Sequence, residues 1–383
     1  MTVNGALVAG PIVPNTPTID NGQSVTLAAD ASGGITPYSY QWYSNGSCTS
    51  TISSAKSSTL VASPAITSTY SYKVTDSASS SQCSPSNTVT VNPALLAGTI
   101  TPATPSIDNG QSITLGANPT GGTPVYSYQW FSGSSPTCTS DTTLLGTSAT
   151  QTVTPSANTY YCYTVSDSAF THASQSSTTD LVTVNPVLVA GPIAPSSPTI
   201  DNGQSVTLTT ASSGGTTPYS YQWYSTANCS GGSLISGAIS STYLASPTST
   251  TTYSYKVTDS SQGTPVGSTC SSADTITVNP TLVASAISPP TPTIDTGQSI
   301  TLTAHATGGT LSLSYQWYSD GLCNNAIAST ASSTYTASPT VNTSYTYKVT
   351  DSAYVPESQC SPANTIIVSP GLLARAISPS NPS

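Results

Sequence analysis

The sequence predicts an all-β chain of four consecutive β-sandwich domains. Two observations support this: a motif that recurs at a fixed period, and short segments that alternate polar and apolar residues. The motif Asp-[Asn/Thr]-Gly-Gln-Ser-[Val/Ile]-Thr-Leu begins at Asp20, Asp108, Asp201 and Asp295, so successive copies lie 88, 93 and 94 residues apart. This period is longer than the roughly 20 to 50 residues of a solenoid unit and suits one small domain.

The period sets the expected domain boundaries. We expect domains over residues 5–93, 94–186, 187–280 and 281–370, called repeats 1 to 4 below, and the start of a truncated fifth repeat over 371–383. Both ends match the interior of the pattern, because residues 2–4 match 90–92 and residues 372–374 match 95–97. We expect the chain to be a section of a longer repetitive polypeptide.

The first half of repeat 1 contains two strand signals with a turn signal between them. Residues 7–13 predict a short strand, which Pro11 confines to a sheet edge because proline cannot donate to a ladder. Asp20-Asn21-Gly22 predicts a tight turn, since Asn-Gly accepts positive φ. Residues 24–29 then alternate, which places Val25 and Leu27 on one face.

The second half of repeat 1 continues the alternation. Residues 38–43 place Trp42 on one face and Tyr43 on the other, and Trp130, Trp223 and Trp317 occupy the same position in the other repeats. Residues 59–61, 70–74 and 88–92 predict the remaining strands. Because no segment shows a helical period, about seven strands per ninety residues predict a β-sandwich with these tryptophans in the core.

The spacing of these motifs resembles a known family. Gly-Gln-Ser-Val-Thr-Leu, then Trp42, then Tyr70-Ser71-Tyr72-Lys73-Val74 resembles strands B, C and F of immunoglobulin-like (Ig-like) domains. The strings Pro-Tyr-Ser-Tyr-Gln-Trp and Tyr-Ser-Tyr-Lys-Val-Thr-Asp are similar to Ig-like and PKD-like repeats of archaeal and bacterial cell-surface proteins. The resemblance implies a tandem array of four Ig-like sandwiches. The family's buried B–F disulfide is absent, because Ala29 and Tyr72 occupy its two positions.

Each repeat contains two cysteines, which predicts a disulfide within each repeat and an oxidising compartment. The second cysteine follows strand F in repeats 1, 3 and 4 but lies on strand F in repeat 2. In those three repeats the pairing stays open between three alternatives. Either the segment after strand F folds back to allow a bridge within the repeat, or bridges run between domains, or some thiols are free. The expected pairs are Cys48 with Cys83, Cys138 with Cys162, Cys229 with Cys270, and Cys323 with Cys360.

Composition restricts the partners and the location. Only 5% of the residues are charged and the net charge is -9, so the chain lacks the basic surface of a nucleic-acid-binding protein. A surface of Ser and Thr suits an extracellular or cell-surface protein. No apolar run is long enough to span a membrane. Glycosylation sequons begin at Asn45, Asn228 and Asn342.

The sequence offers little chemistry. It contains two His and one Glu, so no catalytic residue and no bound metal or cofactor is expected. Asp20 and Asp76 lie at turns, where their expected role is hydrogen bonding to nearby backbone. A calcium site at a domain junction is the alternative, although no Asp-x-Asp run is present.

The junctions predict a semi-rigid rod. Linkers of one or two residues follow Asn-Pro or Ser-Pro at 92–93, 185–186, 279–280 and 369–370, and such proline-stiffened linkers cannot swing freely. Apolar Leu95 and Leu96 are expected to be buried between successive domains.

These observations predict a non-catalytic extracellular stalk or spacer of a microbial surface protein, with neighbouring repeats as its first partners. One alternative is an adhesin or carbohydrate-binding array, in which outward aromatics stack on cell-surface glycans: Tyr43, Phe131, Tyr224 and Tyr318. A third possibility is a self-assembling fibre, in which exposed strand edges pair copies of the chain.

Overall fold

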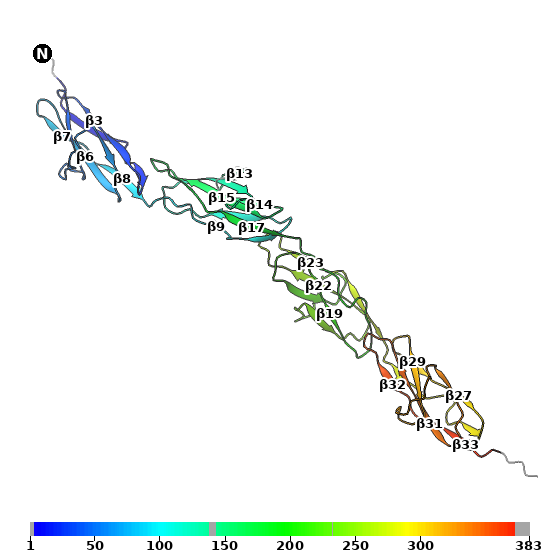
Figure 1. Ribbon diagram of the computed structural model, residues 1–383. Helices are drawn as coiled ribbons and strands as arrows, with labels where there is room; N and C mark the ends of the chain where they lie inside the picture. Colours follow the sequence, from blue (N-terminus) through cyan, green and yellow to red (C-terminus); the bar gives the residue numbers. More distant parts are fainter. Residues whose placement is uncertain (1–3, 138–142, 232, 372–383) are drawn as a thin grey trace, which may run out of the picture. The chain divides into compact units, whose positions relative to one another are not determined.

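The computed structural model describes residues 4–137, 143–231 and 233–371, and all regular elements in them are strands (Figure 1). The chain divides into two compact units, Met1–Val187 with Ser261–Val266, and Leu188–Ser260 with Gly267–Ser383. The expected fifth repeat, apart from Gly371, lies outside the described residues.

Repeat 1 is a sandwich of two sheets. The smaller sheet has the order β1-β3-β5, and the larger has the order β2-β8-β6-β4, with β7 paired to β6. β2 runs parallel to β8, and all other pairs are antiparallel. The strands are β1 (Val8–Val13), β2 (Thr18–Asp20), β3 (Val25–Ser32), β4 (Ser39–Tyr43), β5 (Thr59–Ala62), β6 (Ser68–Thr75), β7 (Ser81–Cys83) and β8 (Asn87–Asn92).

The sequence patterns explain this arrangement. β1 contains Pro11 and lies at a sheet edge, as expected. β3 buries Val25 and Leu27, and β4 buries Trp42. β6 buries both Tyr72 and Val74. The expected order of strands and the inward residues are therefore confirmed in repeat 1.

Repeat 2 follows the same plan with an added strand. β10-β17-β15-β12-β13 form the larger sheet, with β16 paired to β15, and β14-β11-β9 form the smaller. Its strands are β9 (Ile100–Thr101), β10 (Ser106–Asp108), β11 (Ile113–Ala117), β12 (Ser127–Gly133), β13 (Thr143–Gly146), β14 (Thr150–Val153), β15 (Thr159–Ser166), β16 (Ser174–Ser176) and β17 (Asp180–Asn185).

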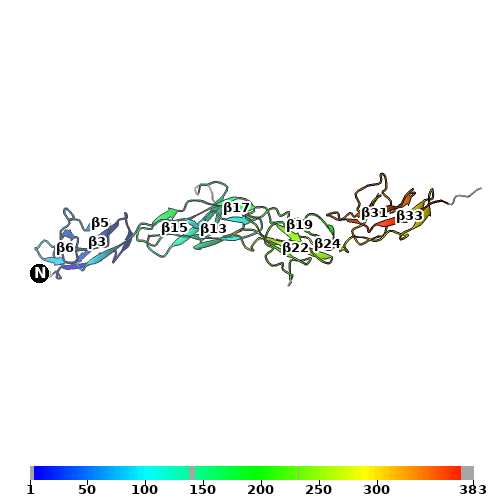
Figure 2. The same ribbon diagram turned by 90° about the horizontal axis from the view of Figure 1, so that it is seen from below.

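Repeats 3 and 4 repeat the larger sheet of repeat 1, as β18-β24-β22-β20 and β26-β33-β31-β29. Figures 1 and 2 show β31 beside β33, with which it pairs antiparallel. The strands of repeat 3 are β18 (Thr199–Asp201), β19 (Val206–Thr209), β20 (Ser220–Tyr224), β21 (Thr242–Ala245), β22 (Thr251–Thr258), β23 (Ser268–Cys270) and β24 (Asp274–Asn279). Those of repeat 4 are β25 (Val283–Ala284), β26 (Thr293–Asp295), β27 (Ile300–Thr303), β28 (Ala306–Thr307), β29 (Ser314–Tyr318), β30 (Thr334–Ala337), β31 (Thr343–Thr350), β32 (Ser358–Cys360) and β33 (Asn364–Ser369).

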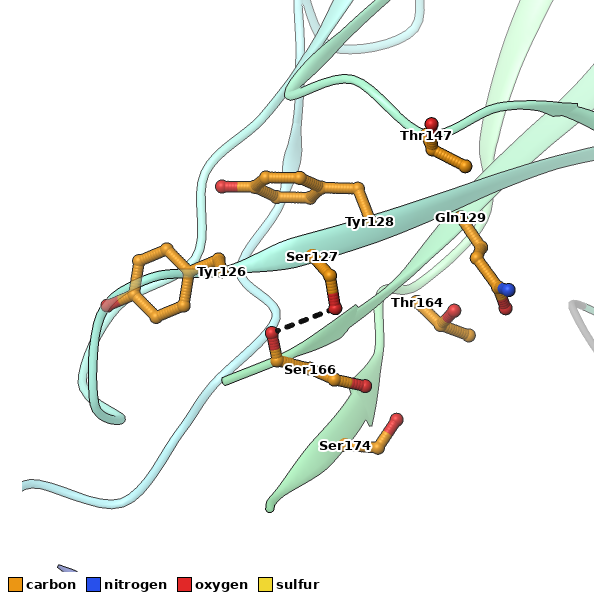
Figure 3. A pocket seen from close by; sticks show the side chains of 8 residues that line it. All are labelled: Tyr126, Ser127, Tyr128, Gln129, Thr147, Thr164, Ser166 and Ser174. Carbon is orange, nitrogen blue, oxygen red and sulfur yellow. Dashed lines mark hydrogen bonds between the residues drawn. The ribbon is translucent and has the colours of Figure 1, made fainter. Parts of the chain in front are cut away.

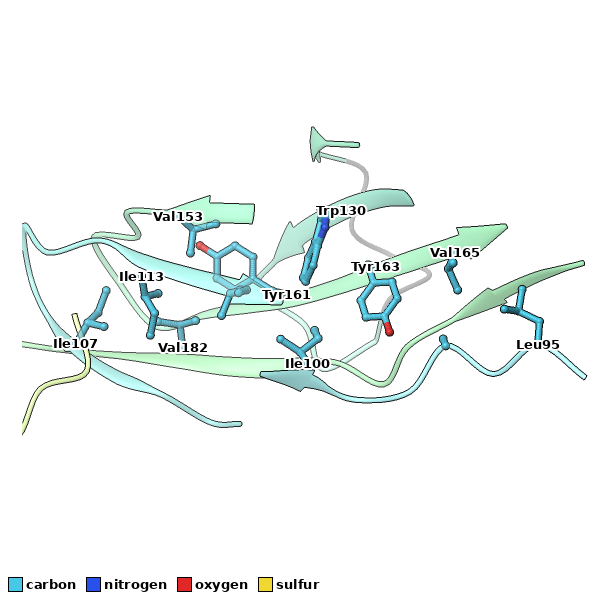
Figure 4. Close-up of a cluster of buried hydrophobic side chains, with 12 residues drawn as sticks. Leu95, Ile100, Ile107, Ile113, Trp130, Val153, Tyr161, Tyr163, Val165 and Val182 are labelled. Atoms are coloured by element: carbon cyan, nitrogen blue, oxygen red, sulfur yellow. The ribbon is translucent and has the colours of Figure 1, made fainter. Parts of the chain in front are cut away.

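Each repeat has its own hydrophobic core, centred on a tryptophan that is 0% exposed. In repeat 2, Trp130 packs against Tyr163 with ring centroids 5.1 Å apart (Figure 4). Trp42 and Tyr72 form the same contact in repeat 1, where the Tyr72 hydroxyl donates to the carbonyls of Gly10 and Asp30, each at 2.9 Å. This tyrosine joins the two sheets where the related fold places a disulfide.

One expectation about the junctions is wrong. Leu95 is buried, but it belongs to the core of repeat 2, and Leu96 is 61% exposed. Alternation along the chain explains the difference, because adjacent residues of an extended segment point to opposite sides. The junctions inside each unit are made by polar groups instead.

Candidate functional site

A buried polar site lies where repeat 1 meets repeat 2. Asp20 ends β2 and is 1% exposed. The Thr123 hydroxyl of repeat 2 donates to Asp20 Oδ1 at 2.9 Å, and Asn92 Nδ2 donates to Thr123 Oγ1 at 3.0 Å. The backbone N–H of Phe170 donates to the Thr18 carbonyl at 2.8 Å. Two adjacent repeats are thus held by a chain of hydrogen bonds, which we call the junction clamp.

The second carboxylate of the clamp is Asp167, which follows β15. Its Oδ2 accepts the N–H of Thr123 at 3.1 Å, and its Oδ1 accepts the N–H groups of Ala169 at 3.3 Å and Ala173 at 2.9 Å. Backbone N–H groups favour an ionised carboxylate. Asp167 therefore orders the loop that carries Phe170.

Asp20 and Asp167 form a pair of facing carboxyl groups. Asp20 Oδ2 is buried and accepts a hydrogen bond from no donor in the described part of the chain. Burial, followed by interaction with Asp167, raises the pKa of Asp20 to about 6. Burial alone would raise the pKa of Asp167, but the hydrogen bonds from Asp20 and from the backbone outweigh it and lower that pKa below 3.8. Below a pH of about 6, protonation of Asp20 removes the repulsion between the two carboxyl groups.

The second unit contains the same clamp between repeats 3 and 4. Thr310 Oγ1 donates to Asp201 Oδ1 at 2.9 Å, and Asn279 Nδ2 donates to Thr310 Oγ1 at 3.0 Å. The N–H of Tyr354 donates to the Thr199 carbonyl at 2.8 Å. Burial and the facing Asp351 raise the pKa of Asp201 to about 6. The clamp is therefore a repeated feature of the fold.

Local sequence positions these groups. The turn after Asp20 uses Gly22 at φ +91°, and the Asp20 N–H donates to Gln23 Oε1 at 2.9 Å. Before Thr123, Gly122 has φ +68°, and a Cβ there would lie 2.9 Å from Asp167 Oδ2. The Asp-Asn-Gly turn motif thus also places Asp20, the acceptor of the clamp. The glycine pair Gly121-Gly122 places Thr123, its donor.

Asp20 and Asp76 both lie at turns, but only Asp76 hydrogen-bonds to nearby backbone as expected. Asp76 Oδ1 accepts the N–H groups of Ala78 and Ser80 in its own loop. Asp20 instead accepts from Thr123, 103 residues away. A threonine after each glycine pair in repeats 2 to 4 was the available signal.

Three disulfides are described, each within one repeat. The Cα atoms of Cys48 and Cys83 lie 6.2 Å apart, those of the Cys229–Cys270 pair 6.0 Å, and those of the Cys323–Cys360 pair 6.3 Å. β7 folds back along β6, which places Cys83 opposite Lys73 and within reach of Cys48. Cys162 is also disulfide-bonded, and Cys138 lies outside the described residues. Such bridges are typical of an oxidising compartment.

The three sequon asparagines differ in their surroundings. Asn228 and Asn342 are exposed, whereas Asn45 is half-buried and its Nδ2 donates to Thr49 Oγ1 at 2.6 Å. Glycan attachment requires that Nδ2 be accessible. Asn228 and Asn342 are therefore the better candidates.

The outward aromatics occupy one equivalent position in each repeat. Tyr43, Phe131, Tyr224 and Tyr318 are all half-buried, and each ends or nears the end of a core strand. Tyr43 pairs with Thr51 through a backbone bridge, and Tyr224 and Tyr318 make the same kind of bridge. Phe131 instead pairs with Leu144 of β13.

Repeat 2 also carries a polar groove of about 500 Å³ on its larger sheet (Figure 3). Eight uncharged residues line it: Tyr126, Ser127, Tyr128, Gln129, Thr147, Thr164, Ser166 and Ser174. Figure 3 shows the Tyr128 ring, which also lines the groove, on the side of β12 opposite Ser127. The groove lacks the residues of a catalytic or metal site.

The described residues contain no cluster of three or more His, Cys, Asp or Glu side chains that could hold a metal ion. Among them, no helix could span a membrane.

Comparisons with known proteins concern the fold alone. No protein-family model and no curated protein matches the sequence. Among solved structures, the N-terminal four Ig domains of Dscam1 isoform 6.9 are 17% identical, with a TM-score of 0.28 over 95% of this chain and 99% of that chain. Immunoglobulin domains 1–4 of Sidekick-1 are 13% identical, with a TM-score of 0.32 over 93% and 97%.

The strand order of this chain defines its class. The smaller antiparallel layer is one sheet in each of repeats 1 to 3, and the two strand pairs β25-β28 and β27-β30 in repeat 4. In the larger sheet of each repeat an early strand runs parallel to the last. This is the arrangement of Ig-like sandwiches. The chain is a tandem array of Ig-like domains, as the sequence predicted.

Proposed function

We propose that the chain is a non-catalytic stalk or spacer of a microbial surface protein, and that its repeats set a fixed reach. The observation that supports this proposal most directly is the junction clamp. It recurs with matching donors and acceptors in both compact units. A chain whose only role is reach needs stable domains and restrained junctions. The disulfide, the buried tryptophan and the clamp supply these.

The domain limits at residues 93, 186, 280 and 370 belong to the same proposal. The four cores each draw on residues of a single repeat, which favours these limits. A proline follows each last strand, and the clamp in each unit lies next to such a linker. Short linkers and clamped ends together would restrict bending between domains.

The competing functions need features that the stalk does not. An adhesin needs a surface that binds glycans, for which the outward aromatics are the candidates. A fibre needs strand edges that pair between copies. In each repeat the outward aromatic is half-buried, which favours a packing role for it.

Small-angle X-ray scattering of the full chain at several concentrations tests the proposal. We expect a monomer whose maximum dimension is that of four domains in extended order and does not change with concentration. The control is a glycan-binding assay on the wild type and on Tyr224→Ala with Tyr318→Ala. Concentration-dependent filaments would establish the fibre instead, and glycan binding lost in the double variant would establish the adhesin.

A further inference from the structure

The clamp has an acceptor side on one repeat and a donor side on the next. All four repeats have the acceptor aspartate, but not all have the donor groups. We call the Asp of the turn and the carbonyl two residues before it the trailing face, because they accept from the next repeat. The trailing face of repeat 1 is Asp20 and Thr18. All four repeats keep the aspartate, at positions 20, 108, 201 and 295. The acceptor side is thus uniform.

The donor side, called the leading face, has two parts. One is the residue after the glycine pair, and the other is the loop between the aspartate after strand F and the short strand that follows. In repeat 2 these are Thr123 and residues 168–173, and in repeat 4 they are Thr310 and residues 352–357. Both loops have six residues, and in both the third residue donates its N–H to the trailing face.

The loop acts mainly through its backbone and its length, with one long side-chain bond from Thr171 Oγ1 to the Ser24 carbonyl at 3.4 Å. The Phe170 ring is 53% exposed and the Tyr354 ring is 54% exposed, so neither ring is buried at the junction. The donated N–H groups require the loop to extend far enough to reach Thr18 or Thr199. Loop length, more than side-chain identity, should therefore decide whether this bond forms.

Repeat 1 lacks both parts of the leading face. Ile35, which is 47% exposed, replaces the threonine and has no hydroxyl to donate. Its loop is residues 77–80, two residues shorter than those of repeats 2 and 4. The internal bonds are nevertheless kept, because Asp76 accepts the N–H groups of Ile35, Ala78 and Ser80. Only the outward donors are missing.

We propose that the leading face determines which repeats dock, and that its partner is the trailing face of any repeat of this kind. A threonine after the glycine pair and a loop of at least six residues are the two determinants. Repeat 1 offers a trailing face to its neighbour but does not dock on one itself. The array would therefore have an order that its own surfaces specify.

The loss test uses the full chain with the leading face of repeat 1 placed on repeat 2. The variant carries Thr123→Ile and a deletion of residues 170–171, which gives the four-residue loop found naturally in repeat 1. Spin labels on unnatural amino acids at Val61 and Leu144, which are 67% and 55% exposed, report the distance between repeats 1 and 2 by pulsed electron spin resonance. We expect the distance distribution to widen about twofold or more, because undocked domains move relative to each other by default.

A matched label pair at Leu244 and Val341, 61% and 68% exposed, serves as the control in the unaltered second unit. Its distribution should stay narrow in the same variant. Circular dichroism and tryptophan fluorescence check that repeat 2 still folds. A narrow distribution between Val61 and Leu144 in a folded variant would overturn the proposal, as would a distribution already wide in the wild type.

The gain test replaces residues 94–186 with a second copy of repeat 1. This copy should not dock, and its label distances to the first repeat should be widely distributed. Introducing Ile35→Thr and residues 168–173 in place of 77–80 into the second copy should restore the narrow distribution. If the grafted copy stays undocked, the two determinants are insufficient and the proposal fails. The proposed stalk role is tested separately by scattering and glycan binding, so either can fail alone.

Discussion

The carboxyl pair at the junction makes a specific prediction for Asp20→Asn. In the wild type above pH 6, both Asp20 and Asp167 are ionised, and the buried Oδ2 of Asp20 faces a second negative charge. Asparagine keeps Oδ1 as the acceptor for Thr123 and places an N–H donor where Oδ2 was. The new side chain in Asp20→Asn therefore resembles protonated Asp20, so at neutral pH the junction of this variant should be as stable as the wild-type junction is at acidic pH.

The magnitude follows from the pKa of Asp20. The rise from 3.8 to about 6 sets an upper limit of roughly 3 kcal/mol, at about 1.4 kcal/mol per pH unit. A raised pKa means that docking favours the protonated form. This contribution is fully present below pH 3.8, declines as the pH rises, and is lost above about 6. Asp167 acts in the opposite sense, because its lowered pKa means that its contribution is lost as the pH falls further. The clamp should be most stable near pH 4 to 5.

Hydrogen exchange of the Phe170 amide, which bonds to the Thr18 carbonyl, measures opening of the clamp. After correction for intrinsic exchange, protection in the wild type should fall between pH 4 and pH 7. In Asp20→Asn it should stay nearly constant, and at pH 7.5 it should exceed that of the wild type by up to about 100-fold, since about 1.4 kcal/mol is a factor of ten.

Two comparisons make the result decisive. The Tyr354 amide of the second unit keeps its wild-type partner Asp201 and should retain its pH dependence in the same sample. Asp295→Asn changes a half-exposed aspartate in the equivalent turn and should leave Phe170 unaffected. The reasoning is refuted if wild-type protection at Phe170 does not change with pH, or if Asp20→Asn lowers it at pH 7.5.

Three further changes test the domains themselves. Tyr72→Phe removes the hydroxyl that joins the two sheets and should lower the free energy of unfolding of repeat 1 by about 1 to 2 kcal/mol in chemical denaturation. Replacing Cys48 and Cys83 by serine opens a loop with a sequence separation of 35 and should cost about 4 kcal/mol, and reduction of the wild type should reproduce the loss. Gly122→Ala should destabilise repeat 2 by at least about 1 kcal/mol, measured by the same denaturation, because its φ is +68° and the new Cβ would meet Asp167 Oδ2.

The sequence was most informative where local pattern and burial coincide. Alternation in residues 24–29 and 38–43 identified Val25, Leu27 and Trp42 as inward, because a strand with one buried face has a period of two. Proline at position 11 identified an edge strand for the same local reason. The β-sandwich class required nothing beyond such patterns and their fourfold recurrence, whereas the Ig-like assignment rested on a resemblance of motif spacing to that family.

The site could not be predicted in the same way, because its partners are far apart in the chain. Asp20 lies before Asn-Gly, and a turn role explained it fully at the local level. Its burial depends on Thr123 and on Asp167, 147 residues away, which only the packing of two repeats brings together. The partner of Cys83 could not be predicted for a similar reason. β7 folds back onto β6 because the two strands pair, and no local turn motif signals this.

The low charge of the chain and the chemistry of its clamp are connected. With only 5% charged residues, the surface offers few ion pairs with which to fix one domain on the next. The clamp instead uses a threonine hydroxyl, an asparagine amide and a backbone N–H, and these bonds are not screened by salt. Its one electrostatic element is repulsive, because it consists of two facing carboxylates. Salt should therefore leave the junction unchanged or strengthen it slightly, whereas protons should strengthen it strongly. A surface array built in this way would keep its reach across a wide range of ionic strength and would respond mainly to acidity.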